Sequence, residues 1–509
     1  MSLATVATRA ELGLEAPEVS CEVHLSGGLP RMVIGGLAET AVKESGERVK
    51  AAIRQSGFEF PDGKISINLA PADLPKRGSR FDLAIAIGIL AASGQLPAAQ
   101  LAQYEFFGEL AFSGALRPVG GLLPALMRAG QRCCIVPSGC QAEVSLLRRD
   151  STLHAEHLLS VVRYLTGKAE LPQVTPADLP SAAVLNVASS EDMADIRGQF
   201  QARRALEIAA AGGHNMLMVG PPGTGKTMLA RRLAGLLPPM EEQQLVETIL
   251  IHSLTHRVSQ AGAQWNPDQF ASYQQRPFRA PHHTASAIAL VGGGRPPRPG
   301  EISLAHNGVL FLDELPEFAR SALEALREPL ERGRIRIARA EHSVVFPASF
   351  QLVAAMNPCA CGFHGDRAKE CRCSPDQVRR YQSRISGPFL DRIDIKLELS
   401  RSGLEWAPRE KAPGESTAII KARQAPATAR QYARTGTLNS RLSAAEISRC
   451  CTPDNAGLKI LRQAAERFGM SARACDSVLR VARTIADLAD ADKVSKTHVS
   501  EALTLRKMG

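Results

Sequence analysis

Short apolar runs alternate with longer stretches of helical periodicity through the middle of the chain. The runs at 215–219, 309–312 and 351–355 have the length of buried strands. A glycine- and proline-rich loop follows the first run, and residues 228–237 continue with the spacing of a helix. Strands that alternate with helices are typical of a parallel sheet covered by helices. We therefore expect an α/β domain at about 191–400.

The C-terminal part of the chain shows helical spacing without strands between the helices. Residues 401–440 are basic and rich in proline, glycine and alanine, which favours a linker with room for one helix at 416–435. Beyond it, apolar residues recur on one helical face in four segments: 444–449, 456–468, 472–490 and 496–505. We expect a helical lid domain at 441–509.

The N-terminal part contains the longest apolar run, residues 83–92, which starts beside Asp82. Ten residues are too few to cross a bilayer, so the run predicts a buried helix. Residues 166–190 contain three prolines and no clear period, which predicts a linker. These two features define a first domain at 1–165.

Composition excludes several classes of protein. The chain has 509 residues, of which 44% are hydrophobic and 22% charged, an ordinary balance for a globular protein of about three domains. No basic start followed by an unbroken apolar run opens the sequence, so we expect no signal peptide, no membrane span and a cytoplasmic location. The eleven cysteines are consistent with a reducing compartment.

The net charge of +10 is unevenly distributed. Residues 1–165 carry 16 basic and 16 acidic side chains, whereas residues 401–509 carry 19 basic and 11 acidic ones. A basic C-terminal third favours a polyanionic partner such as nucleic acid, although solvated helix faces have a similar composition. With five Tyr and two Trp, the chain offers few platforms for base stacking, which favours contacts along the phosphate backbone.

One segment has the spacing of a phosphate-binding loop, G-x-x-x-x-G-K-T, between a predicted strand and a predicted helix. Its glycines allow backbone N–H groups to curl around phosphate oxygens at a helix N-terminus. Lys226 would reach the β- and γ-phosphates, and Thr227 would bind Mg²⁺. The eight residues are Gly220, Pro221, Pro222, Gly223, Thr224, Gly225, Lys226 and Thr227.

Polar side chains end the next two strands. Asp313 and Glu314 follow the run at 309–312, and Asn357 follows the run at 351–355 by two residues. We expect Asp313 to hold Mg²⁺ through water, Glu314 to orient or deprotonate the attacking water, and Asn357 to orient that water near the γ-phosphate. Two adjacent acids favour hydrolysis of the nucleotide over binding alone.

Together these motifs resemble those of the AAA+ ATPases. Residues 389–394 (FLDRID) are similar to the arginine-finger segment of the magnesium-chelatase and MCM branch. By that resemblance Arg392 acts in trans on the ATP of a neighbouring subunit, and Arg473 within 471–474 (SARA) is the sensor 2 residue.

Longer stretches of sequence indicate a more specific family. Those at 281–286 (PHHTAS), 292–318, 383–394, 28–61 and 68–90 closely resemble the YifB/ComM family of magnesium-chelatase-like AAA+ proteins. The resemblance implies a homo-hexameric ring that binds single- and double-stranded DNA, including branched or D-loop forms. It also implies ATP-driven branch migration and unwinding during homologous recombination in natural transformation, with recombination proteins as further candidate partners. Two alternatives are the motor subunit of a magnesium chelatase and an AAA+ remodeller of proteins.

Residues 1–165 resemble the proteolytic domain of Lon-type proteases, an α+β fold shared with ChlI-type subunits. Lon places its nucleophilic serine in a G-P-S-A-G turn, but the turn here reads 78–82 (GSRFD) with Arg80 at the serine position. The position that resembles that of the catalytic lysine holds Ala125. A Ser–Lys mechanism needs both groups, and Ser79 has no obvious partner, so we expect a non-catalytic domain and no protease activity.

Four of the cysteines fall within fifteen residues, as two C-x-C pairs on the loop just after Asn357. Four thiolates suit tetrahedral Zn²⁺ if the loop folds back, and His364 could replace one thiol. Free cysteines are the alternative. We expect structural zinc, bound by Cys359, Cys361, Cys371 and Cys373.

Basic and apolar residues alternate at 334–339 and are followed by 343–346, which predicts a β-hairpin. The hairpin occupies the position of the pre-sensor-1 hairpin that lines the channel in this AAA+ branch, so Arg336 and Arg339 are candidates for DNA phosphate contacts. A solvated strand face is the alternative. The adjacent His282 and His283 are expected to belong to a channel loop and not to a metal site.

Overall fold

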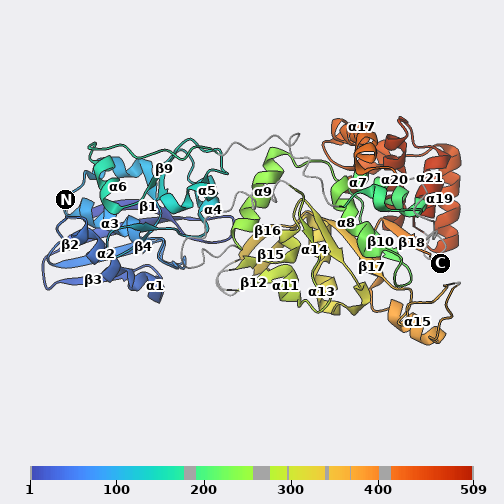
Figure 1. Ribbon diagram of the computed structural model, residues 1–509, viewed down its shortest axis with the longest axis horizontal. Coiled ribbons are helices and arrows are strands. Elements are labelled where there is room, and N and C mark those ends of the chain that lie inside the picture. The colour runs from blue at the N-terminus through green and yellow to red at the C-terminus, as the bar shows by residue number, and fades with distance from the viewer. Residues whose placement is uncertain are drawn as a thin grey trace.

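The computed structural model describes residues 3–176, 191–255, 275–294, 297–338, 343–366, 368–400 and 414–506. Figure 1 shows the N-terminal part at one end, the middle part at the centre and the C-terminal helices at the other end. Arg339 and parts of both predicted linkers lie outside these described residues.

The N-terminal part is built on a seven-stranded sheet of order β3-β4-β2-β1-β5-β8-β9. The pairs β1·β2 and β2·β4 are antiparallel, while β3·β4, β1·β5, β5·β8 and β8·β9 are parallel. The strands are β1 (Leu3–Arg9), β2 (Glu18–Ser26), β3 (Arg31–Gly35), β4 (Lys64–Ala70), β5 (Tyr104–Phe106), β8 (Cys133–Pro137) and β9 (Thr152–Ala155). A short hairpin, β6 (Glu109–Leu110) and β7 (Leu116–Arg117), accompanies the helices α1 (Thr40–Lys43), α2 (Ser45–Gln55), α4 (Leu122–Arg128), α5 (Gln141–Val144) and α6 (Leu158–Leu165).

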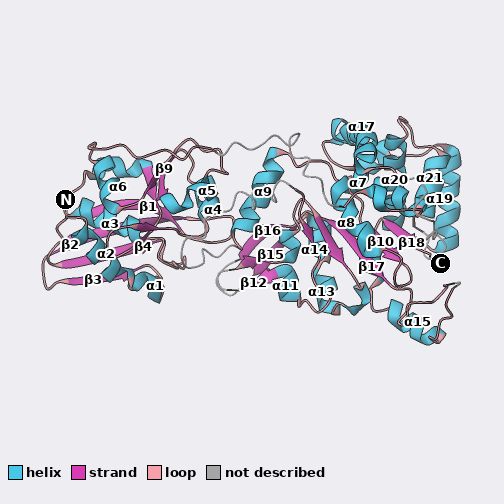
Figure 2. Ribbon diagram, in the orientation of Figure 1, coloured by secondary structure: helices cyan, strands magenta, loops and turns pink. Residues whose placement is uncertain are grey.

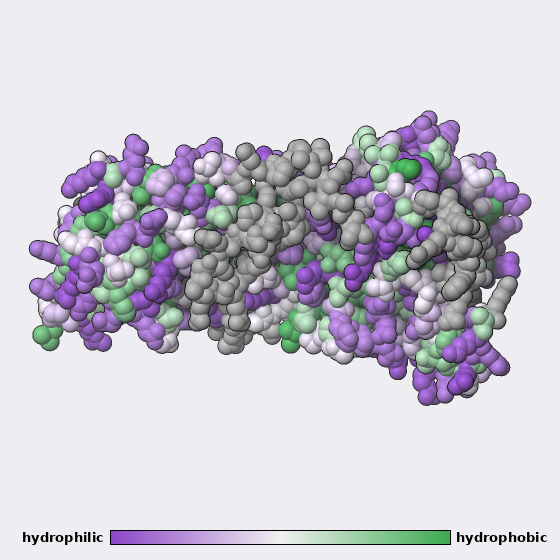
Figure 3. Space-filling model, viewed as in Figure 1, coloured by the Kyte–Doolittle hydropathy of each residue, from purple (hydrophilic) through white to green (hydrophobic). Residues whose placement is uncertain are grey.

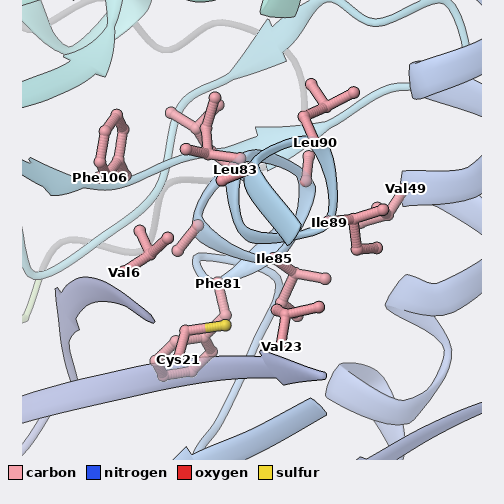
Figure 4. Close-up of a cluster of buried hydrophobic side chains, with 14 of the residues drawn as sticks. Val6, Cys21, Val23, Val49, Phe81, Leu83, Ile85, Ile89, Leu90 and Phe106 are labelled. Atoms are coloured by element: carbon pink, nitrogen blue, oxygen red, sulfur yellow. The ribbon is translucent and has the colours of Figure 1, made fainter. Parts of the chain in front are cut away.

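The predicted buried helix is confirmed as α3 (Asp82–Ala92), in which every residue is buried. Figure 4 shows it surrounded by apolar side chains such as Val6, Val23 and Phe106. At Gly88 the helix approaches β2 closely, because a Cβ there would lie 2.6 Å from a methyl group of Val23. A continuous apolar sequence is therefore required, since α3 has no face exposed to water.

The middle part contains a five-stranded sheet of order β11-β14-β17-β10-β18 in which all neighbours are parallel. Its strands alternate between two apolar clusters: Met216 and Met218 of β10 pack on one face, and Leu217 packs on the other. This two-sided burial confirms the α/β prediction. The strands are β10 (Met216–Val219), β11 (Phe278–Arg279), β14 (Val309–Leu312), β17 (Gln351–Met356) and β18 (Ile395–Glu398).

Helices flank this sheet, as Figure 2 shows. The helices before and after the first strand are α7 (Phe200–Gly212), α8 (Lys226–Leu236) and α9 (Glu242–Ser253). Shorter elements connect the later strands: α11 (Ala287–Val291), β12 (Gly292–Gly293), β13 (Arg298–Pro299), α12 (Glu301–Leu304), α13 (Arg320–Ala325), α14 (Arg327–Arg332), β15 (Arg334–Ala338), β16 (Ser343–Pro347), α15 (Pro375–Gln382) and α16 (Gly387–Leu390).

The C-terminal helices confirm the predicted helical region. They are α17 (Thr417–Thr435), α18 (Ala444–Cys450), α19 (Asn455–Phe468), α20 (Ala472–Leu488) and α21 (Lys496–Thr504). The helix expected at 416–435 packs on α7, where Gln424 donates to the backbone oxygen of Glu207 at 2.9 Å and Gln431 to that of Ala211 at 3.0 Å. The helical unit therefore includes α17, which lies within the stretch predicted as a linker.

The first part of the predicted linker at 166–190 pairs with the N-terminal sheet. The N–H of Val174 donates to the backbone oxygen of Thr152 at 2.9 Å, and that of His154 donates to Pro172 at 3.0 Å. Residues 172–174 thus pair with β9 at the edge of the N-terminal sheet. Backbone contacts with the N-terminal sheet therefore continue beyond residue 165.

The N-terminal part contacts the middle part through α9 and the β15–β16 hairpin. Ile249 and Leu250 of α9 share one apolar cluster with Leu122 and Leu126 of α4, and Figure 1 shows these two helices close together. A Cβ at Gly13 would lie 2.5 Å from a methyl group of Val344, so the loop after β1 lies against the hairpin.

The surface of the molecule is mixed in character. On the face shown in Figure 3, hydrophilic side chains cover both ends and apolar side chains form small scattered patches. Within the described ranges, no helix combines the length and apolar character needed to cross a membrane.

Candidate nucleotide site

The phosphate loop joins β10 to α8, as the sequence predicts. Gly223 and Gly225 have φ values of +80° and +82°, a left-handed conformation that side chains disfavour, so the glycines permit the turn. Thr224 is buried, and its hydroxyl donates to the backbone oxygen of Pro221 at 2.9 Å. The loop ends where Lys226 begins α8, which directs the positive end of the helix dipole toward the turn.

Lys226 is held by three oxygen acceptors. Its Nζ donates to the backbone oxygens of Gly220 at 2.7 Å and Pro221 at 3.0 Å, and to Oδ1 of Asn357 at 3.1 Å. Burial lowers the pKa of the Lys226 ammonium, while the nearby Asp313 and Glu314 act in the opposite direction. A phosphate group would compensate this loss of hydration because it supplies anionic oxygens at the same point.

Thr227 and Asp313 lie in direct contact. The Thr227 hydroxyl donates to Oδ2 of Asp313 at 2.8 Å. A hydroxyl and a carboxylate at this spacing are the oxygen ligands that Mg²⁺ prefers, directly or through water. The residues present therefore fit the cation that a nucleotide would carry.

Glu314 lies beside Asp313 in a left-handed conformation, with φ at +52°. Oε2 of its carboxylate lies 3.0 Å from Nδ1 of His283, within ion-pair distance. Sequence reasoning assigned His283 to a channel loop and did not foresee this contact, because nothing in the local pattern pairs 283 with 314. The structure thus adds His283 as a candidate positioning partner for the carboxylate that is predicted to orient or deprotonate water.

Asn357 follows β17, which lies between β14 and β10 in the sheet. The carboxyl ends of parallel strands share one edge, so Asp313, Glu314 and Asn357 follow their strands at the edge where the phosphate loop begins. The predicted residues of the phosphate loop, the two acids and the amide are therefore brought together.

The two candidate arginines meet at an acid that sequence reasoning missed. Arg392 forms a short ion pair with Glu331 of α14, and Arg473 donates to the same carboxylate at 2.8 Å. The side chain of Arg392 is only 8% exposed, whereas that of Arg473 is 51% exposed. Within one chain, both guanidinium groups thus share the single carboxylate of Glu331, which balances one of their two positive charges.

The predicted hairpin is formed by β15 and β16, which pair antiparallel. Arg334 and Arg336 are exposed, while Ile335 and Ile337, which alternate with them along the strand, are buried. Two guanidinium groups therefore lie on one strand face that is open to solvent. Arg339 lies outside the described residues.

The four clustered cysteines converge. Their Sγ atoms all lie within 4.8 Å of one another, with Cys359 buried and the other three half-buried. This soft donor set fits one tetrahedral metal ion such as Zn²⁺. His364 is not part of the group that the described residues form.

The turn that resembles a protease nucleophile site contains a buried cation. Arg80 is only 3% exposed, its guanidinium lies 5.6 Å from the Phe107 ring centroid, and burial lowers its pKa. Ala125 is buried in α4, and the Ser79 hydroxyl donates to Glu109. Arg80 thus occupies the predicted nucleophile position, and no lysine stands at residue 125.

Comparison with known proteins covers most of the chain. The family "Magnesium chelatase, subunit ChlI" matches residues 192–405, "Subunit ChlI of Mg-chelatase" matches 21–139, and "Magnesium chelatase, subunit ChlI C-terminal" matches 414–506. The last match starts just before α17.

Individual relatives extend over the full length. The chain is 48% identical to protein YifB of Salmonella typhimurium, across 99% of this chain and 97% of that protein. It is 47% identical to competence protein ComM of Haemophilus influenzae, across 100% of this chain and 98% of that protein. The magnesium-chelatase 67 kDa subunit of Chlorobaculum parvum is 30% identical over 168 residues, 32% of this chain and 23% of that protein.

Proposed function

The chain belongs to the YifB/ComM family of magnesium-chelatase-like AAA+ proteins, and from this premise we propose that it is an ATP-driven DNA motor. The observation that carries the ATPase part is the convergence of Lys226, Thr227, Asp313, Glu314 and Asn357 at one sheet edge. The likeness to ComM over the full chain supports a role in handling DNA during competence. Branch migration and unwinding of recombination intermediates are the proposed work of the motor.

The proposed mechanism uses each residue of the site for one task. The phosphate loop and Lys226 would bind the β- and γ-phosphates, Thr227 and Asp313 would hold Mg²⁺, and Glu314 would take a proton from the attacking water while Asn357 orients it. A Mg²⁺ ion held there would help to neutralise the charge that develops on the phosphate oxygens.

Two arginines complete the proposed catalytic site, and one of them, Arg392, would act across a subunit boundary. Arg392 of one subunit would leave Glu331 and approach the γ-phosphate held by its neighbour, and Arg473 would serve as the sensor 2 residue. A cationic finger of this kind typically accelerates phosphoryl transfer by roughly 10³–10⁵-fold. Each site would then need two chains, which supports assembly into a ring, and the resemblance to the family supports a homo-hexamer.

The ring is proposed to bind single- and double-stranded DNA, including branched and D-loop forms, with recombination proteins as partners. Arg336 on the exposed face of the β15 strand supports phosphate contacts in the channel, and Arg339 is proposed for the same role. The basic segment 401–509 provides further positive charge. Non-specific backbone contacts of this type give salt-dependent binding.

The remaining sites receive structural roles in this proposal. Cys359, Cys361, Cys371 and Cys373 would hold one Zn²⁺ in a reducing, cytoplasmic environment. The N-terminal domain would act in assembly or partner docking and not as a protease, because Arg80 and Ala125 provide neither nucleophile nor base.

A second candidate is a magnesium-chelatase-type motor subunit, which the three matching family descriptions favour. Such a subunit would act on a partner that inserts the metal. Stimulation by DNA distinguishes the two candidates, and it also separates the DNA motor from an AAA+ remodeller of proteins.

The test measures ATP hydrolysis and strand displacement on forked and three-stranded DNA. We expect hydrolysis to rise with DNA, and displacement to require ATP and to be lost in Lys226→Ala, because that variant lacks the phosphate-binding ammonium. The matched control Lys64→Ala removes an exposed lysine of β4 and should behave as wild type. Hydrolysis that is unchanged by every DNA tested would reject the motor and favour the second candidate.

A further inference from the structure

The loop that carries the first cysteine pair lies against the phosphate loop. Gly362 has a left-handed φ of +86°, and a Cβ at this position would lie 2.8 Å and 2.9 Å from ring carbons of Pro222. The same Cβ would lie 3.9 Å from the side-chain carbon of Asn357. Only glycine therefore permits this approach, which places the backbone of the cysteine loop beside the side chains of Pro222 in the phosphate loop and Asn357 after β17.

The position of Gly362 depends on the two cysteines that precede it. Its N–H donates to the backbone oxygen of Cys359 at 3.0 Å, which closes a turn from 359 to 362. Cys359 is fully buried at the base of this turn, and Cys361 is adjacent to Gly362. A ligand that fixes both sulfur atoms would thus fix the turn that touches Pro222.

The sulfur atoms have the spacing of ligands around one small metal ion. The Sγ atoms of Cys359, Cys361 and Cys371 are separated by 3.4, 3.6 and 3.7 Å. Zn–S bonds of about 2.3 Å in a tetrahedron place sulfur atoms about 3.8 Å apart, whereas a disulfide requires about 2.0 Å. The geometry therefore matches a shared metal ion and not a bonded pair.

The second cysteine pair ties the turn to the next helix. Cys373 directly precedes Ser374, whose side chain caps α15, and Gln382 at the end of α15 donates to the backbone oxygen of Pro358 at 3.1 Å. In addition, the Lys369 ammonium lies 4.2 Å from the Phe363 ring centroid. The four thiols also bring the two ends of this loop together, so its order is expected to depend on the metal.

We propose that the cysteine cluster is a metal-dependent brace of the ATP site: bound Zn²⁺ holds the turn 359–362 against Pro222 and so sets the affinity of the phosphate loop for nucleotide. This inference rests on the proposed zinc and ATP sites. It adds that the affinity of the ATP site for nucleotide depends on the bound zinc. Loss of the metal releases the turn, and the phosphate loop loses the surface that supports it.

The experiment measures zinc content and nucleotide affinity on the full-length protein. Elemental analysis gives zinc per chain, and titration with a fluorescent ATP analogue gives Kd before chelation, after chelation and after addition of Zn²⁺. Three of the cysteines are half-buried, so a chelator can reach the metal. We expect one zinc per chain, and a Kd that rises roughly tenfold, about 1.4 kcal/mol, on chelation and recovers with Zn²⁺ but not with Mg²⁺.

Two pairs of variants separate the metal from the contact. Cys371→Ser removes a ligand that lies outside the turn 359–362 and should lower both zinc content and nucleotide affinity, whereas Cys133→Ser, in the N-terminal sheet, should change neither. Gly362→Ala should keep zinc but weaken nucleotide binding. Its control is Gly365→Ala, because Gly365 is also left-handed, at +75°, but has open space where the Cβ would be.

Each failure has its own meaning. Absence of zinc from protein purified without chelators overturns the brace together with the zinc site. Full zinc content with a Kd that chelation and Gly362→Ala leave unchanged overturns the brace alone. Zinc-loaded protein that binds no nucleotide overturns both the brace and the proposed ATPase. A Gly362→Ala effect matched by Gly365→Ala shows general loop strain and also rejects the brace.

Discussion

Glu314 shows how single residues at this site are set by neighbours distant in sequence. A non-glycine residue with φ near +52° carries strain, typically about 1–3 kcal/mol, which persists only where the surroundings hold it. Here the N–H of Glu314 donates to Oδ1 of Asp313 at 2.9 Å, and the side chain pairs with His283. The strained backbone and the histidine together fix the direction of the carboxylate.

We predict that Glu314→Gln binds ATP with nearly unchanged affinity but hydrolyses it on the order of 10²–10⁴ times more slowly. Lys226, Thr227 and Asp313 remain for binding, while the group that accepts the proton of water is lost. His283→Gln should lower kcat by a smaller factor without changing the affinity for a fluorescent ATP analogue. Turnover of Glu314→Gln at the wild-type rate would contradict the assignment.

The residues that sequence analysis identified share one property. The phosphate loop is contiguous, and Asp313, Glu314 and Asn357 each follow an apolar run, so their spacing along the chain carries the signal. His283 and Glu331 carry no such signal, because their partners lie far away in sequence and are brought near by folding alone.

Elements were predicted well where burial fixes the pattern. The strand at 309–312 matches β14 at both ends, because all four residues are buried. The strand predicted at 215–219 begins one residue later, since the Asn215 side chain accepts from the N–H of Leu352 at 2.8 Å and donates to the backbone oxygen of Arg392 at 3.1 Å. The two-residue strands, such as β11, are too short to show any period.

The β15–β16 hairpin leads to a prediction about DNA binding. Arg334→Gln combined with Arg336→Gln should weaken DNA binding. The slope of log K against log salt is negative, and its magnitude should decrease by roughly 0.9 for each DNA phosphate that the variant no longer neutralises. Basal ATP hydrolysis should persist, because the exposed face of β15 does not belong to the nucleotide site. Titration by fluorescence anisotropy at several salt concentrations measures the slope.

A matched control comes from α15, where Arg379 is 77% exposed and lies on a different element. Arg379→Gln should leave the salt slope unchanged. If the double hairpin variant also keeps the wild-type slope, DNA follows another path, with the basic segment 401–509 as the next candidate.

At the scale of the whole molecule, the contacts between the main parts of the chain are the features that the sequence predicts least well. Leu250 of α9 and Leu126 of α4 pack together across the boundary between the N-terminal and middle parts, and apolar residues of this kind look like ordinary core positions in a sequence. The compositional shift that suggested a linker at 401–440 includes α17, whose polar Gln424 and Gln431 pack by hydrogen bonding to α7. The composition of this stretch therefore does not reveal that α17 packs against α7.

The arrangement of Arg392 and Arg473 on one carboxylate suggests how a single chain differs from a ring. The two guanidinium groups share the one carboxylate of Glu331, and a γ-phosphate from a neighbour would compete with Glu331 for Arg392. If so, complete catalytic sites exist only at interfaces between subunits. ATP should then drive ring formation.

We therefore predict complementation between two inactive variants. Arg392→Ala retains an intact phosphate loop and Lys226→Ala retains an intact finger, so a mixture forms some interfaces with both. In a randomly mixed ring about one quarter of the interfaces are complete, and ATP hydrolysis should approach that fraction of the wild-type rate. Mixing Lys226→Ala with the double variant Lys226→Ala/Arg392→Ala should yield none, since no intact loop is present. Mixed rings without activity, in a sample whose size by light scattering shows assembly, would place the action of Arg392 within its own chain.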